Sequence, residues 1–349
     1  MIKVKLVGAT GYGGVGLIEL ILRHPDMEIA ALVAATETGR PISSFWPHLK
    51  GFCDEMVYGA DDAQADVDAD VVVFSTPDRI GMQLAPAEVE KGRKVLDYSG
   101  DFRFNSPELY GEYAARLGLE RQHAAPQLLA ECVYGLAELH RKEIAAAPVV
   151  GNPGCYAVAC ILGLAPAAAE GLVEPSTLIC DCKTGISGAG KKPKPGFHYP
   201  EAYDSAYAYR LTGHQHVMEV ERELSLLAGD AIRITFTPQV IPMARGILAT
   251  VYGRLAPGFS QQQVMEAYRE FYRGDPFVRV MENPAATGQV RGSNFVNLTV
   301  ACDERTATLR IISHIDNLVK GQAGSAMQNL NIMFGLEETA GLWLPGAHP

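Results

Sequence analysis

The sequence predicts an α/β protein of two domains. The first is expected to contain a doubly wound parallel sheet, and the second to be an α+β domain with a mostly antiparallel mixed sheet. Up to about residue 150, strand-like and helix-like segments alternate, which is typical of parallel sheets. After Gly154, strand-like segments follow one another with few helices between them. The length of 349 residues also favours two domains.

The first domain opens with a strand over Ile2–Val7, a glycine-rich turn and an apolar helix that stops before Pro25. Buried strands then follow in "MEIAALVAAT" and in "ADVVVFSTPD", where the strand ends at a Ser-Thr-Pro turn. The stretch "GMQLAPAEVEKG" is expected to be helical, and "RKVLDYSGDFRF" to form a further strand and a loop. This order of elements indicates βαβ units.

The second domain begins with a helix over about 156–171 and contains a second clear helix, from a Ser260 cap to Gly274. The final segment, "DNLVKGQAGSAMQNLNIMFGL", is expected to be a helix with small residues on one face. We expect this last helix to complete the first domain, which gives a domain of 1–150 plus about 316–349 and a second of 151–315. The expected strands are "TLICDCKTG", "AIRITFTPQVIP", "GILATVYGRL", "NFVNLTVACDE" and "TATLRIISHID".

The composition excludes several classes of partner. A formal net charge of -10 does not suit nucleic acid or an anionic membrane, which both require a basic face. The sequence contains no run of about 18 apolar residues, so no membrane span is expected. The N-terminus lacks the pattern of a signal peptide, so we expect a cytoplasmic protein with reduced cysteines. The seven cysteines include no CxxC pair, so no metal site is expected, and Cys180 and Cys182 are expected to fill the core.

The glycine-rich turn "GATGYGG" predicts a dinucleotide site. Gly8, Gly11 and Gly14 match GxxGxxG between a strand and a helix, where glycines permit a tight turn and close approach of a pyrophosphate. The end of the second strand, "VAATETGR", carries no acidic residue at the position that binds the ribose of NAD. Thr36, Thr38 and Arg40 suit a 2′-phosphate instead, which favours NADP(H), although Arg40 could be a plain surface residue. Further expected cofactor contacts are Thr10, Tyr12, Gly13, Ser75 and Thr76.

Cys155 is the candidate nucleophile. The turn Gly151–Gly154 places it at the start of a helix, where unpaired N–H groups and the helix dipole lower the pKa of a thiol. The same N–H groups could hold an oxyanion. Cys160, in contrast, lies inside the helix and has none of these features. A dinucleotide loop together with one cysteine at a helix start suggests oxidoreduction through a thioester. The alternative is that Cys155 is a small buried residue near a domain junction.

A cysteine nucleophile needs a base, and the best candidate segment is "LTGHQHVMEVEREL". His214 and His216 lie two apart, just before Glu219 and Glu221 at the start of a helix. No third ligand suggests a metal, so one histidine as the base and the other as a substrate contact is the favoured interpretation.

Taken together, these motifs resemble the N-acetyl-γ-glutamyl-phosphate reductase family, relatives of aspartate-semialdehyde dehydrogenase. The resemblance covers essentially the whole chain. The matching stretches, in the family's order, are "GATGYGG", "DYSGDFRF", "VYGLAELHR", "VGNPGCYA", "TGISGAGKKP", "GHQHVMEVE", "PMARGILATVY" and "DNLVKGQAGSAMQNLNIMFG".

The resemblance implies an NADPH-dependent reduction of an acyl phosphate to an aldehyde in arginine biosynthesis, by a homodimer or homotetramer. It implies that Cys155 forms the thioester, that His216 is the acid/base and that Glu219 orients it. His214 would contact substrate, although the two histidines could exchange roles. Arg103, Asn152, Ser187 and Lys191 would bind substrate, and Gly188 and Asn317 the nicotinamide half of the cofactor.

Two residues have plainer alternatives, since Arg103 could form a surface ion pair and Asn317 could cap a helix. The chain also departs from the family pattern. Ala137 stands where a proline is common, Gln322 stands where an alanine is common, and "VAATETGR" lacks a frequent Ser-Arg pair. These departures leave open a related reductase of carrier-bound α-aminoadipyl phosphate or of aspartyl phosphate. A dinucleotide-binding regulator without catalysis is the alternative from another class.

Overall fold

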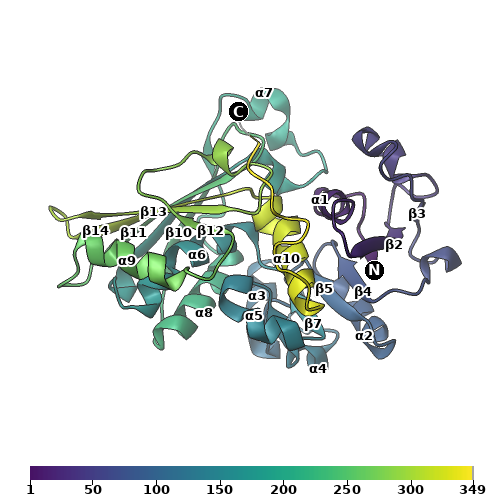
Figure 1. Cartoon of the computed structure of the whole chain (residues 1–349), viewed down its shortest axis with the longest axis horizontal. Helices are drawn as coiled ribbons and strands as arrows, with labels where there is room; N and C mark the ends of the chain where they lie inside the picture. The colour runs from purple at the N-terminus through teal and green to yellow at the C-terminus, as the bar shows by residue number, and fades with distance from the viewer. Residues whose placement is uncertain (348–349) are drawn as a thin grey trace. The chain divides into compact units, whose positions relative to one another are not determined.

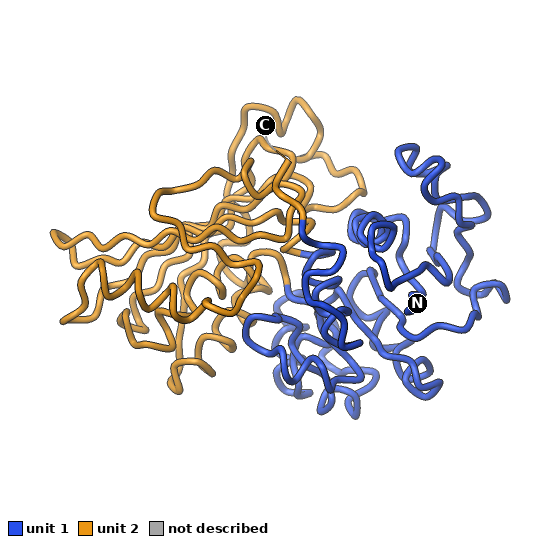
Figure 2. Tube along the Cα trace, in the orientation of Figure 1, with its two compact units in different colours: residues 1–153, 322–343 blue, residues 154–321, 344–349 orange. Residues whose placement is uncertain are grey.

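The structure, a computed structural model, describes residues 1–347 and divides into two compact units (Figure 2). Unit 1 comprises Met1–Pro153 and Gln322–Trp343. Unit 2 comprises Gly154–Gly321 and the residues from Leu344 onward. The first boundary between the units therefore falls one residue before Cys155.

Unit 1 contains a seven-stranded sheet in the order β3-β2-β1-β4-β5-β7-β6, in which every neighbouring pair is parallel (Figure 1). This confirms the predicted α/β class. The strands are β1 (Ile2–Val7), β2 (Met27–Val33), β3 (Val57–Tyr58), β4 (Val71–Phe74), β5 (Lys94–Asp97), β6 (Cys132–Tyr134) and β7 (Val149–Gly151). The helices are α1 (Tyr12–Ile21), α2 (Gly81–Glu90), α3 (Pro107–Arg116), α4 (Pro126–Leu129), α5 (Ala137–Ala146) and α10 (Gly324–Met333).

The core of unit 1 follows from its apolar strands. All four residues of β4 are buried, as expected for a central strand of a parallel sheet. Strand β7 was not among the predicted strands, because only Val149 and Val150 precede the turn in "VVGNPGC". The structure inserts β7 between β5 and β6, so the turn before Cys155 starts from the sheet.

Unit 2 contains a second seven-stranded sheet, in the order β12-β13-β14-β11-β8-β10-β9. Four of its six neighbouring pairs are antiparallel, which confirms the predicted mixed sheet. The strands are β8 (Leu178–Thr184), β9 (Tyr207–Ala208), β10 (Ile234–Val240), β11 (Ile247–Arg254), β12 (Val278–Val280), β13 (Val296–Asp303) and β14 (Thr308–Ile315). The helices are α6 (Cys155–Ala169), α7 (Tyr199–Ala202), α8 (His216–Ala228) and α9 (Gln261–Phe271).

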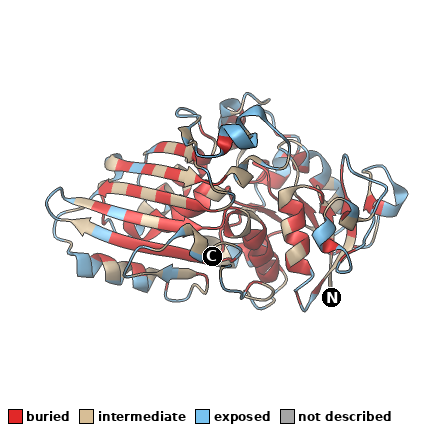
Figure 3. Ribbon diagram, turned by 90° about the horizontal axis from the view of Figure 1, so that it is seen from above, coloured by how far each residue is buried: buried red, intermediate tan, exposed pale blue. Residues whose placement is uncertain are grey.

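Along several of these strands, buried and less buried residues alternate, so one face of the sheet is covered (Figure 3). Helix α6 covers that face and is buried along nearly its whole length. Cys180 and Cys182 point into this core, as predicted, and the sulfur of Cys182 lies 3.5 Å from that of Cys160. Ser260 caps α9 through a capping box, also as predicted.

The C-terminal segment is not one continuous α-helix. A π-helical turn, Val319–Ala323, precedes α10. The boundary between the units falls inside this turn, after Gly321. No helix among the described residues 1–347 is long and apolar enough to cross a membrane.

Candidate active site

Cys155 is the first residue of α6, and Gly154 is the N-cap. Cys155 itself is only partly buried, whereas nearly all the residues that follow it in α6 are buried. At this position the positive end of the helix dipole favours a thiolate, and the first N–H groups of the helix have no acceptor within it. The arrangement can therefore supply both a nucleophile and donors to an oxyanion.

His216 lies directly against the residue before Cys155. It is the first residue of α8, and a Cβ added to Gly154 would lie 2.3 Å from its Nε2 atom. Gly154 adopts φ -74° and ψ 145°, which any residue can adopt, so space and not backbone strain requires glycine here. The absence of a side chain at Gly154 lets the imidazole approach the start of α6.

Glu219 ties the two helix starts together. It is 1% exposed, and its Oε2 atom accepts a hydrogen bond of 2.9 Å from the N–H of Gly154. Its Oε1 atom lies 4.0 Å from Nε2 of His216, three residues earlier on the same helix face. A buried carboxylate at this distance stabilises a positive imidazole and restrains its orientation.

His214 lies in a more apolar environment than suits a group that transfers protons. It is 3% exposed, and its ring packs against those of Tyr156, Tyr209 and Phe236. Burial, followed by the charges of His216 and Arg210, lowers the pKa of His214 to about 2. Its Nδ1 atom accepts from the N–H of His216 at 3.3 Å. His214 is therefore neutral at physiological pH and supports the position of His216.

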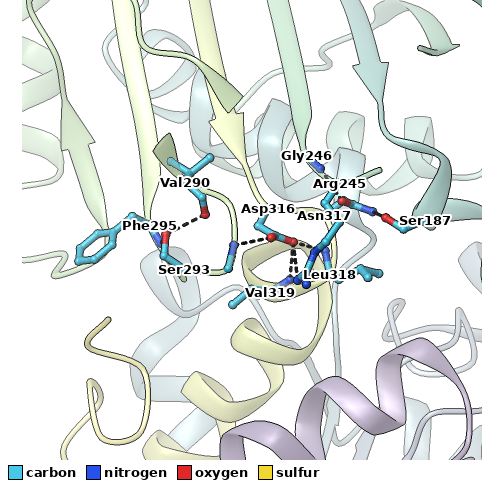
Figure 4. Close-up of polar contacts among 11 residues, drawn as sticks. Ser187, Arg245, Gly246, Val290, Ser293, Phe295, Asp316, Asn317, Leu318 and Val319 are labelled. Atoms are coloured by element: carbon cyan, nitrogen blue, oxygen red, sulfur yellow. Dashed lines mark hydrogen bonds and ion pairs between the residues drawn. The ribbon is translucent and has the colours of Figure 1, made fainter. Parts of the chain in front are cut away.

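The loop after β8 and the loop after β14 meet in unit 2 (Figure 4). Asn317 donates to the hydroxyl of Ser187 at 3.0 Å and accepts from the N–H of Gly246 at 2.7 Å. A Cβ on Gly188 would lie 3.7 Å from the same amide, so the structure brings these three predicted residues together. The alternative of Asn317 as a helix cap is wrong, because the side chain of Asp316 accepts from the N–H groups of Leu318 and Val319.

The glycine loop of unit 1 is shaped by close contacts. Gly8 has φ +90°, and a Cβ there would lie 2.2 Å from the carbonyl oxygen of Ser75. A Cβ on Gly14 would lie 2.4 Å from the carbonyl oxygen of Gly8. Gly11 is the N-cap of α1, and a Cβ there would make only a contact of 3.6 Å. The first and third glycines are thus required by the fold, and the second leaves space for a ligand.

Other predicted cofactor residues lie in this loop or directly after β4. A Cβ on Gly13 would lie 2.7 Å from the hydroxyl of Ser75. The hydroxyl of Thr76 is buried, with no hydrogen-bond partner among the described residues. The carbonyl of Thr10 accepts from the Trp46 indole at 3.1 Å, and the rings of Tyr12 and Trp46 lie 5.9 Å apart. A turn with four glycines at the start of α1 fits a dinucleotide phosphate.

The residues expected at a 2′-phosphate lie after β2, on the surface of unit 1. Thr36 and Arg40 are exposed, and the guanidinium of Arg40 lies 4.6 Å from the centre of the Phe45 ring. Glu37 has φ 63°, in the left-handed region. This short segment therefore offers a hydroxyl and a stacked guanidinium.

Arg103 is not a surface residue, so the alternative of a surface ion pair is wrong. It is 8% exposed, and it donates to the carbonyl oxygens of Asn152 at 2.9 Å and Tyr98 at 2.7 Å. The side chain of Asn152 bonds to the carbonyl of Gln322 and to Asn329, all within unit 1. Lys191, in contrast, is partly exposed, in the loop that follows Gly188.

Comparison with known proteins places this geometry in a family. A profile described as the semialdehyde dehydrogenase NAD binding domain matches residues 3–147, and one described as the dimerisation domain matches residues 155–317. The chain is 43% identical to an N-acetyl-gamma-glutamyl-phosphate reductase of Geobacter metallireducens, over 98% of both chains. It is 42% identical to the reductase of that name from Acidithiobacillus ferrooxidans, again over 98% of both. The chain belongs to the N-acetyl-γ-glutamyl-phosphate reductase family.

Solved structures support the fold of this reductase family member. Aspartate semialdehyde dehydrogenase II of Vibrio cholerae aligns with a TM-score of 0.71 at 17% identity, covering 96% of this chain and 98% of that one. The aspartate semialdehyde dehydrogenase of Candida albicans, solved with NADP, aligns with a TM-score of 0.67 at 17% identity, over 96% and 98% of the two chains. At this identity the likeness concerns the fold alone.

Two residues near the site of this reductase were missed from the sequence. A Cβ on Gly321 would lie 2.7 Å from Cβ of Cys155, so this glycine lets the π-helical turn pass against Cys155. Asp316 was read only as part of a helix start. Its position directly before Asn317 was the available signal, because Asp is a stronger capping residue than most. No cluster of metal-ligating side chains occurs among residues 1–347.

Proposed function

We propose that the chain reduces N-acetyl-γ-glutamyl phosphate with NADPH to N-acetyl-glutamate 5-semialdehyde and phosphate, as its relatives' name implies. The observation that carries the proposal is the close packing of His216 and Glu219, in the first turn of α8, against Gly154, the residue directly before Cys155 at the start of α6. A nucleophile, a proton-transfer group and an orienting carboxylate are the parts that acyl transfer through a thioester requires.

In the proposed reaction, the thiolate of Cys155 attacks the acyl carbon. The bond between this carbon and the phosphate oxygen breaks, so free phosphate leaves and a thioester remains. The N–H groups at the start of α6 stabilise the oxyanion that forms during the attack. Arg103, Asn152, Ser187 and Lys191 are proposed to hold the substrate and its phosphate, with Arg103 and Lys191 supplying positive charge.

NADPH supplies the hydride that reduces the thioester carbon. His216 then protonates the resulting oxygen and later takes that proton back as the carbon–sulfur bond breaks, which releases the aldehyde and the Cys155 thiolate. Glu219 supports the positive form of His216. His214 has a pKa lowered to about 2 by burial, which supports His216 rather than His214 as the acid/base.

The choice of NADP(H) is supported by the segment after β2, where Thr36 and Arg40 are exposed and no carboxylate ends the strand. Gly8, Thr10, Gly11, Tyr12, Gly13, Gly14, Ser75 and Thr76 are proposed to hold the pyrophosphate side, and Gly188 and Asn317 the nicotinamide side. We expect Arg40→Ala to raise KM for NADP about tenfold, the scale of one lost charge-assisted contact, and to leave KM for NAD nearly unchanged.

Unit 1 is proposed to be the dinucleotide-binding domain and unit 2 the catalytic domain. The match of residues 155–317 to a dimerisation domain supports a homodimer, or a homotetramer built from it. Arginine biosynthesis in the cytoplasm is the proposed setting.

The reverse reaction tests the proposal. Purified protein is mixed with N-acetyl-glutamate semialdehyde, phosphate and NADP, and NADPH is followed by its absorbance. We expect phosphate-dependent NADPH formation that Cys155→Ser abolishes and the matched variant Cys160→Ser, in the buried part of the same helix, retains. Tight NADP binding without turnover of this aldehyde would contradict the proposed substrate and favour a carrier-bound or aspartyl phosphate.

A further inference from the structure

Asp316 is a buried carboxylate that the proposed mechanism does not use. It follows the last residue of β14 and is 0% exposed. One oxygen, Oδ1, accepts from the N–H groups of Leu318 at 2.8 Å and Val319 at 3.1 Å. The other, Oδ2, accepts from the N–H of Gly292 at 2.6 Å. Figure 4 shows Asp316 at the centre of these contacts.

Arg245 supplies the positive charge opposite Asp316. Its guanidinium lies 3.1 Å from Oδ1 and is one-third exposed. The residue that follows, Gly246, donates to the side chain of Asn317 at 2.7 Å. The ion pair and this neighbouring bond therefore join the loop before β11 to the end of β14 at two consecutive residues.

The same loop also holds the segment that carries Ser187. The N–H of Ser187 donates to the carbonyl of Ala244 at 3.1 Å, and that of Gly185 donates to the carbonyl of Gly246 at 2.9 Å. A displacement of Arg245 would thus move both partners of the bond between Asn317 and Ser187.

Asp316 also fixes the turn that lies against the nucleophile. Its backbone carbonyl accepts from the N–H of Gly321 at 2.9 Å, five residues later, which is the π-helical pattern. Gly321 in turn is packed so closely against Cys155 that a Cβ would lie 2.7 Å from the Cβ of the cysteine. The carboxylate of Asp316 therefore caps the start of this turn, and its carbonyl bonds to the glycine that lies against Cys155.

We propose that Asp316 is a positioning residue for the reaction at Cys155, acting through Gly321 on the thiol and through Asn317 on Ser187, with Arg245 as its charge partner. This inference rests on the proposed function for its effect on turnover. Its effect on the thiol itself does not depend on the identity of the substrate.

Asp316→Asn is the sharpest test. The amide is nearly isosteric, but it has only one acceptor oxygen, so an NH₂ group must face either the N–H of Gly292 or the N–H groups at the start of the turn. It also removes the charge opposite Arg245. A shift of about 1 Å at a reacting group costs roughly 100-fold in rate, so we expect kcat to fall at least about tenfold while KM changes less than about threefold. Arg245→Lys, which keeps the charge and loses the fork, is a milder variant with an expected smaller fall in kcat.

The second readout is the rate at which iodoacetamide alkylates Cys155 without any ligand, followed by mass spectrometry. We expect Asp316→Asn to slow this alkylation at least about threefold. Glu88→Gln is the control, because Glu88 is a part-buried carboxylate paired with Lys5 and Arg93 in unit 1. It should lower the melting temperature and leave both kcat and the alkylation rate unchanged.

A folded Asp316→Asn protein with the wild-type kcat and alkylation rate would overturn the proposal. Equal losses in Asp316→Asn and Glu88→Gln would also overturn it, because they would show a general effect of stability. If the wild-type protein has no turnover with the aldehyde, the proposed substrate fails, and the alkylation rates alone decide the role of Asp316.

Discussion

Replacing Gly154 by alanine should lower the kcat of this protein strongly while the protein still folds. The backbone angles of Gly154 suit alanine, so the substitution adds only a methyl group. That methyl carbon would lie 2.3 Å from Nε2 of His216 and 2.5 Å from its Cδ2. The imidazole must retreat by about 1 Å to regain ordinary van der Waals contact.

The His216 ring can move, but only away from the start of α6. The His216 ring lies 4.9 Å from the His214 ring and 6.1 Å from the Tyr156 ring, so it moves within a packed group. Overpacking of this kind costs about 1–3 kcal/mol of stability. A misplacement of about 1 Å in a proton-transfer group costs roughly 100-fold in rate. We therefore expect kcat to fall about 100-fold in a protein that still folds.

The assay is the reverse reaction, with thermal unfolding measured in parallel. Gly163→Ala is the matched control, because it adds the same methyl group to the same helix at an ordinary distance of 3.4 Å from Ile311. It should keep the wild-type kcat and gain up to about 1 kcal/mol from helix propensity. A Gly154→Ala protein with the wild-type kcat would refute the reasoning that His216 must approach α6 this closely.

Three further outcomes are expected. At neutral pH iodoacetamide should modify Cys155 faster than the other cysteines, because burial raises the pKa of thiols such as Cys182; mass spectrometry of the modified peptides would show any faster competitor. Burial lowers the pKa of His314 to about 4 from 6.5. The neutral His314 side chain therefore contributes stability above pH 6.5, and this stability is lost as the pH falls toward 4. His314→Gln should flatten that part of the profile of melting temperature against pH. Gly8→Ala should destabilise unit 1 by more than about 1 kcal/mol because φ is +90°, whereas Gly11→Ala should fold normally and weaken NADP binding in a fluorescence titration; equal melting temperatures for the two would contradict this difference.

The elements that were predictable from the sequence are those whose signal is local. The strand Ile2–Val7, the glycine turn and α1 follow one another within about twenty residues, and each carries its own pattern. The same holds for Cys155, because a Gly-Asn-Pro-Gly turn before a run of helix formers is enough to place it at a helix start. Strands β3, β6 and β7 were not predicted, because two or three residues carry no periodicity.

The site residues that were missed, or were left with two alternatives, depend on contacts between distant segments. Nothing near Arg103 in the sequence indicates that its side chain donates to the carbonyl of Asn152, 49 residues later. The difference between His214 and His216 depends on Phe236 and Tyr209, whose rings pack against His214. Asp316 and Asn317 are both of capping residue types, and only the tertiary structure assigns the cap to Asp316.

The spacing of His216 and Glu219 has an evolutionary consequence. Both lie in the first turn of α8, so the pitch of one helix sets their separation, and the upstream segment 191–211, which contains α7 and β9, does not. Insertions or replacements in that segment would therefore leave the separation of His216 and Glu219 unchanged. A library that diversifies only this segment would vary the chain upstream of α8 while the helix pitch keeps these two side chains at one spacing.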